Sequence, residues 1–130
     1  MAGELILIIE DNEKNRKLVR DVLQFKGYRT SEAETAEIGL TLARESRPAL
    51  ILMDIQLPGM SGIDALGHLR ADPVTRDIPV MAVTASAMTQ DRQKILAAGF
   101  DAYESKPIDV KSFVAHVAEM LAAGPRGGAR

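Results

Sequence analysis

The sequence contains no cysteine, which excludes disulfide bonds, thiolate metal sites and cysteine nucleophiles from the chemistry of the protein. It also has no apolar run long enough to cross a membrane. The run near its start, Leu5 to Ile9, is too short for the core of a signal peptide, lacks a basic leader and continues directly into Glu10 and Asp11. We therefore expect a cytoplasmic protein with no membrane partner.

An excess of positive charge is absent as well. The chain has 16 Lys and Arg residues against 18 Asp and Glu residues, which gives a net charge of −2. Because the phosphate backbones of DNA and RNA bind clustered Lys and Arg, this balance argues against a nucleic acid as the ligand. With 130 residues and a hydrophobic fraction of 46%, the chain can form one domain with its own core.

Short apolar runs alternate with helical patterns along the chain. Five apolar, parallel-type strands that alternate with helices predict an α/β fold in which helices cover both faces of a parallel sheet. We expect the domain to cover residues 3–123 and the Gly-, Pro- and Arg-rich residues 124–130 to form a disordered tail. The predicted strands are residues 5–9, 28–30, 50–53, 80–83 and 102–105, and the predicted helices are residues 15–26, 35–45, 61–70, 90–98 and 110–122.

The spacing of apolar residues predicts which side of each helix faces the core. The residues expected to face inward are Leu18, Val19, Val22 and Leu23 in the first helix, Ile38, Leu42 and Ala43 in the second, Ile63, Leu66 and Leu69 in the third, and Val110, Phe113, Val114, Val117 and Leu121 in the last. His68 and His116 are expected to be solvated, because no carboxylate or cysteine pattern surrounds either of them.

Residues capable of ionic chemistry follow four of the five predicted strands. In parallel α/β sheets, ligands bind beyond the carboxyl ends of the strands, so these residues are expected to converge. Carboxylates that converge repel one another unless a cation lies between them, and oxygen ligands without His or Cys favour Mg²⁺. A hydroxyl and an ammonium group can hold phosphoryl oxygens, and a carboxylate can accept a phosphoryl group. The residues concerned are Glu10 and Asp11, Asp54, Thr84, and Lys106.

Four motifs resemble the receiver domains of bacterial two-component response regulators. The resemblance extends from about Leu5 to Leu121 and implies the flavodoxin-like (βα)5 fold with strand order 2-1-3-4-5. The motifs are Ile9-Glu10-Asp11-Asn12, Leu52-Met53-Asp54-Ile55-Gln56-Leu57-Pro58-Gly59-Met60-Ser61-Gly62, Val83-Thr84-Ala85 and Lys106-Pro107.

The resemblance implies that Asp54 is the phosphoacceptor and that Mg²⁺ is the cofactor. Asp11 and Asp54 would bind the metal directly, with the backbone carbonyl of Gln56 as a further ligand. Glu10 would also lie at the metal, although the Glu-Asp pair makes direct contact a safer assignment for Asp11 than for Glu10. Lys106 would pair with the phosphoryl group.

The resemblance also implies a conformational switch. Thr84 would move toward the phosphoryl group, and Tyr103, three residues before Lys106, would be the rotating aromatic residue. Pro107 would follow a cis peptide bond that directs Lys106 into the site.

Three segments look most like the single-domain DivK-type regulators within this family: Glu10-Asp11-Asn12-Glu13-Lys14-Asn15, Met53-Asp54-Ile55-Gln56-Leu57-Pro58 and Ser105-Lys106-Pro107-Ile108. The resemblance implies a stand-alone signalling protein, a monomer or weak dimer that is not an enzyme in the usual sense. It would receive the phosphoryl group from a histidine kinase or histidine phosphotransfer protein. It would signal to a downstream protein through the fourth helix, fifth strand and fifth helix.

Two alternatives remain at this point. A degenerate receiver would act as a docking module that is never phosphorylated. A phosphatase with an aspartate nucleophile would need a second acid two residues after Asp54, where this chain has Gln56.

Overall fold

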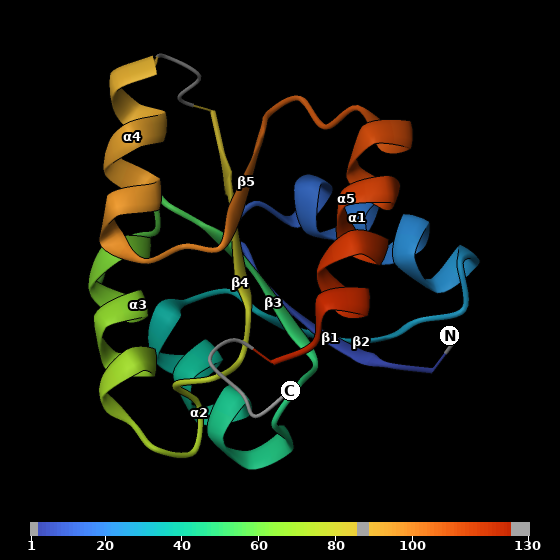
Figure 1. The fold of residues 1–130 in the computed structure, drawn as a ribbon. Coiled ribbons are helices and arrows are strands. Elements are labelled where there is room, and N and C mark those ends of the chain that lie inside the picture. Colours follow the sequence, from blue (N-terminus) through green and yellow to red (C-terminus); the bar gives the residue numbers. More distant parts are fainter. Residues whose placement is uncertain (1–2, 86–88, 126–130) are drawn as a thin grey trace.

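The computed structural model describes residues 3–85 and 89–125, in which strands and helices alternate (Figure 1). The predicted tail therefore lies outside the described residues from position 126 onward, and its disorder stays a prediction. The elements are β1 (Leu5–Ile9), α1 (Glu13–Phe25), β2 (Arg29–Ala33), α2 (Ala36–Ser46), β3 (Leu50–Asp54), α3 (Gly62–Ala71), β4 (Val80–Thr84), α4 (Thr89–Ala98), β5 (Ala102–Ser105) and α5 (Val110–Ala123).

All pairs of neighbouring strands are parallel, and their order in the sheet is β2-β1-β3-β4-β5. Figure 1 shows α1 and α5 on one side of this sheet and α2, α3 and α4 on the other. This architecture confirms the predicted flavodoxin-like fold, including its strand order.

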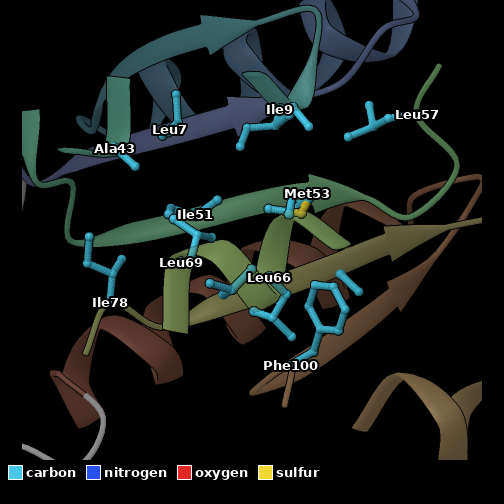
Figure 2. Packing of buried hydrophobic residues seen from close by; sticks show 14 of the residues in the cluster. Leu7, Ile9, Ala43, Ile51, Met53, Leu57, Leu66, Leu69, Ile78 and Phe100 are labelled. Carbon is cyan, nitrogen blue, oxygen red and sulfur yellow. The ribbon is translucent and has the colours of Figure 1, made fainter. Parts of the chain in front are cut away.

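The two faces of the sheet carry separate apolar clusters. Leu7 and Ile9 of β1 point toward α2 and α3, whereas their neighbours Ile6 and Ile8 belong to the cluster under α1 and α5. Figure 2 shows the first of these clusters, in which side chains of β1 and β3 meet those of α3. Because both faces are covered, every residue of β3 and β4 is buried, which explains why these strands are apolar up to their last residues, Asp54 and Thr84.

The prediction that four apolar helix residues face the core is wrong. Leu18, Ile38, Ile63 and Val110 are between 41% and 48% exposed. Helix α2 shows the physical reason, because its buried residues are small, Ala36, Gly39 and Ala43. Leu40 and Leu42 pack against the core cluster from the edges of this face, and Ile38 lies outside it.

Gly39 allows α2 to lie close against β1. A Cβ atom at this position would be 2.8 Å from Cγ1 of Ile9 and closer still to its Cδ1 atom. By contrast, a Cβ atom at Gly67, in the middle of α3, would meet nothing within 4 Å.

These two helical glycines predict opposite effects of the same substitution. Gly39→Ala should destabilise the protein by about 1–3 kcal/mol, because the added methyl group overpacks the contact with Ile9. Gly67→Ala should stabilise it by about 0.5–1 kcal/mol, because it improves helix propensity at an open position. Urea unfolding of both variants measures the difference, and equal effects would contradict the close approach of α2.

Candidate functional site

The acids that follow β1 and β3 lie side by side at the carboxyl edge of the sheet. Ile9 is paired with Met53, so the next residues of the two strands, Glu10 and Asp54, are neighbours. Together with Asp11 they form a cluster in which one carboxylate oxygen from each residue lies within 4.8 Å of the others. Glu10 and Asp54 are each only 5% exposed, whereas Asp11 is exposed to solvent.

Lys106, which follows the edge strand β5, extends its side chain to this cluster. Its backbone NH donates to the carbonyl oxygen of Thr84, which extends the pairing of β5 with β4 by one residue. Its Nζ atom lies 2.8 Å from Oε1 of Glu10 and 3.1 Å from Oδ2 of Asp54. The peptide bond between Lys106 and Pro107 is cis, as the resemblance implied.

Burial and charge act in opposite directions on these groups. Burial raises the pKa of Glu10, although the hydrogen bonds from Lys106 and from the backbone of Asn12 partly offset it. Burial alone would lower the pKa of Lys106, but the hydrogen bonds to Glu10 and Asp54 and the charges of these residues raise it overall. Lys106 therefore stays charged and serves as the counter-ion of both buried carboxylates.

Backbone NH groups fix the second oxygen of each buried acid. The NH of Gln56 donates to Oδ1 of Asp54 over 3.0 Å, and the NH of Asn12 donates to Oε2 of Glu10 over 3.1 Å. Asn12 also caps α1, since its side chain accepts from the NH of Asn15. Each carboxylate is thus oriented by one backbone donor and by Lys106.

The loop after Asp54 returns close to the end of β3. A Cβ atom at Gly62 would lie 2.6 Å from the carbonyl oxygen of Asp54 and 2.8 Å from Cα of Ile55. The NH of Gly62 donates to the carbonyl oxygen of Ile55. Because only glycine fits this contact, residue 62 fixes how α3 starts next to Asp54.

Thr84 and Tyr103 occupy neighbouring strands. Thr84 ends β4, is 1% exposed and lies beside the strand that leads to Lys106. Tyr103 in β5 is half-buried against the apolar cluster under α2, α3 and α4. The guanidinium group of Arg92 in α4 lies 5.0 Å from the centre of the Tyr103 ring, in a cation–π contact. The predicted movement of Thr84 and Tyr103 is not tested by this arrangement.

Two contacts in the structure were not found from the sequence. His116 is not simply solvated, because its Nδ1 atom lies 2.9 Å from Oε2 of Glu104. Arg16 in α1 donates to the carbonyl oxygen of Glu10. The sequence separation of neither pair indicates a contact, because each pair joins residues of different segments of the chain.

The cluster is suited to a hard divalent cation. Glu10, Asp11, Asp54 and Lys106 together carry a formal charge of −2. Their available donor atoms are oxygens, and one member, Asp11, faces solvent, from which water ligands can be retained. These properties fit Mg²⁺, which prefers oxygen ligands and keeps part of its hydration shell. They also fit an aspartate nucleophile beside a lysine that offsets negative charge.

Comparison with known proteins identifies the family. Residues 6–118 match the response regulator receiver domain, and the chain belongs to this family. Its relatives include the polar-differentiation response regulator DivK of Brucella anthropi and that of Brucella ovis. Each is 47% identical over 116 residues, an alignment that covers 89% of this chain and 94% of the relative.

Solved structures agree with this assignment. The receiver domain of a sensor histidine kinase from Pseudomonas aeruginosa, solved with a magnesium ion coordinated in its active site cleft, has a TM-score of 0.86 and 31% identity. That comparison covers 93% of this chain and 99% of the other. A response regulator structure from Chloroflexus aurantiacus has a TM-score of 0.88 and 26% identity, and covers 92% and 98% of the two chains.

The protein is therefore a DivK-like receiver domain of a response regulator, and its role is in signalling. Neither the docking-module alternative nor the phosphatase alternative is favoured by these findings. Among the helices of the described residues, none is long and apolar enough to cross a membrane.

The paired charges predict a specific loss of stability when Lys106 is replaced. Lys106→Met should destabilise the metal-free protein by about 3 kcal/mol at neutral pH, because Glu10 and Asp54 then lose their counter-ion. The loss should shrink as the pH falls. Without Lys106 the pKa of Glu10 rises further in the folded state, so the folded protein takes up protons that the unfolded chain does not.

Urea unfolding across a pH series measures this effect. Lys17→Met is the control, because Lys17 forms an exposed ion pair with Asp21 and its replacement should cost much less. A loss for Lys106→Met that is as small as the control, or independent of pH, would contradict the counter-ion role.

Proposed function

We propose that Asp54 accepts a phosphoryl group from a phosphohistidine, in a reaction that requires Mg²⁺. The donor would be a histidine kinase or a histidine phosphotransfer protein, in keeping with the response regulator family. The observation that carries the proposal is the contact of the Lys106 ammonium with the Asp54 carboxylate inside a cluster of three acids.

The transfer exchanges one bond to phosphorus for another. A carboxylate oxygen of Asp54 forms the new O–P bond, and the N–P bond to the donor imidazole breaks with its electron pair left on that nitrogen. Lys106 offsets the negative charge that the phosphoryl group brings. The NH of Gln56 holds Oδ1 of Asp54 in a fixed direction, so the carboxylate does not need to be ordered during the reaction.

Asp11, Asp54, the backbone carbonyl of Gln56 and Glu10 would hold the metal. Glu10 and Asp54 belong to the acid cluster together with Asp11, and the closeness of their oxygens supports this set. When bound, Mg²⁺ supplies positive charge to the phosphoryl oxygens. Lys106 and the metal would then together offset the negative charge of the three acids.

Phosphorylation would be transmitted through Thr84 and Tyr103. Thr84 would donate its hydroxyl to a phosphoryl oxygen, and the Tyr103 ring would turn inward. Such a change is a shift between two populations, so the phosphoryl group must contact one of them better than the other. The surface formed by α4, β5 and α5 would then bind a downstream protein in the cytoplasm. Similarity to the polar-differentiation response regulator DivK, over 94% of that relative, supports a signalling role.

Labelling of Asp54 tests the central step. Wild-type protein incubated with radiolabelled acetyl phosphate should be labelled when Mg²⁺ is present and not when it is removed with EDTA. Asp54→Asn should abolish the label, since it removes the nucleophile. Asp64→Asn should keep it, because Asp64 lies in the first turn of α3 outside the acid cluster. A wild-type protein that binds Mg²⁺ but takes no label would contradict the proposal and favour a docking module.

The tyrosine content offers a direct test of the switch. The chain has no tryptophan and two tyrosines, so Tyr28→Phe leaves Tyr103 as the only strongly fluorescent side chain. Beryllofluoride with Mg²⁺ should change the tyrosine emission of this variant, because the ring moves relative to Arg92 and the core. The added substitution Thr84→Ala should remove the change without preventing Mg²⁺ binding. An emission change that is the same with and without Thr84 would show that the two residues are not coupled.

A further inference from the structure

Two acids of the cluster stand at the start of the loop that joins β1 to α1, and they are held in different ways. Glu10 is buried and its carboxylate is bound by Lys106 and by the NH of Asn12. The Asp11 carboxylate is exposed, and no other part of the described chain donates to it or pairs with it. The direction of the Asp11 side chain therefore depends on the backbone that carries it.

Arg16, one turn into α1, binds that backbone. Its Nη1 atom donates to the carbonyl oxygen of Glu10 over 2.9 Å and approaches the carbonyl oxygen of Asp11 at 3.5 Å. The side chain is only 13% exposed, so these contacts form largely out of water. A single guanidinium group thus holds the peptide groups that follow Glu10 and Asp11.

The other edge of the guanidinium group is anchored to the sheet. Its Nε atom donates to Oε1 of Glu32 in β2 over 3.1 Å. Glu32 is itself held by Arg20, whose Nη1 atom lies 2.9 Å from Oε2 and 3.2 Å from Oε1. Because the guanidinium fork is planar and rigid, fixing one edge to Glu32 fixes the direction of the other.

We propose that Arg16 is a positioning residue for Mg²⁺: it sets the affinity of the site by holding the loop that carries Glu10 and Asp11. The inference rests on the proposed function only in assuming that this cluster binds Mg²⁺. Arg16 is not one of the residues that would hold the metal or the phosphoryl group. It acts through the two carbonyl groups, and Glu32 acts through Arg16.

Charge alone predicts the opposite effect. Removing a cation near the site would strengthen the binding of Mg²⁺ by Coulomb attraction, whereas loosening the loop weakens it. The ion pair with Glu32 reduces the field of Arg16, so the loss of the loop contacts should dominate. Arg20 provides the matched control, because it carries the same charge and contacts the same carboxylate, but makes no hydrogen bond to the loop within the described chain.

Calorimetric titration of the full chain with MgCl₂ tests the inference. Arg16→Ala should raise the Mg²⁺ dissociation constant about tenfold. Arg20→Ala should change it less than about twofold, which is the size expected of a screened exposed charge. Glu32→Gln, which weakens the anchor of one edge of Arg16 by removing its charge, should give an intermediate increase. Arg16→Lys should also be intermediate, because an ammonium group can reach a carbonyl but does not offer the fork.

Urea unfolding without metal separates this role from a purely structural one. Arg16→Ala and Arg20→Ala each remove an ion pair with Glu32, so we expect similar losses in the free energy of unfolding. Of these two variants, only Arg16→Ala should weaken Mg²⁺ binding. Equal dissociation constants for wild type and Arg16→Ala, or equal weakening by both alanine variants, would overturn the inference. If Arg16→Ala does not fold, wild-type affinity in both Glu32→Gln and Arg16→Lys would overturn it. A wild-type protein that binds no Mg²⁺ would instead overturn the proposed function.

Discussion

Repulsion between carboxylates at one edge of the sheet is the constraint on which the site depends. Glu10 and Asp54 are buried side by side, and such a pair is tolerated only when a positive group lies within reach. Lys106, the residue after β5, supplies that group, although β4 separates β5 from β3 in the sheet. Its long side chain therefore extends across the end of β4. The fold and the chemistry are linked here, because the parallel sheet places the end of β5 where the lysine reaches both acids.

Most strand positions could be predicted from the sequence, whereas the extent of the edge strand β2 and the buried face of α2 could not. Strands β1 and β5 have the predicted bounds, and β3 and β4 extend one residue further than predicted. Strands β1, β3 and β4 are largely apolar because both of their faces pack against apolar clusters. The edge strand β2 was predicted too short, since it is half-exposed and its sequence, Arg-Thr-Ser-Glu-Ala, lacks the continuous apolar pattern. In α2, periodicity favoured Ile38, but close packing against Ile9 selected the face with Gly39.

The acids and the lysine could be located from the sequence because a parallel sheet aligns the ends of its strands. Contacts made by long side chains between elements follow no such rule. Arg70 is an example: it donates to the carbonyl oxygens of Arg76, Ile78 and Gly99 and pairs with Asp101, joining the end of α3 to the start of β4 and β5. Arg16 is another. Their rotamers are chosen by tertiary packing, which local sequence does not encode.

The pairing of Lys106 with acids far earlier in the chain has a consequence for biosynthesis. Asp54 precedes Lys106 by 52 residues, and Glu10 precedes both. A polypeptide growing on the ribosome therefore exposes both acids well before their lysine is translated. Until β5 emerges, a nascent sheet of the first four strands would carry an unbalanced negative rim. The segment that ends in Lys106 thus completes the charge balance of this rim as well as the sheet itself.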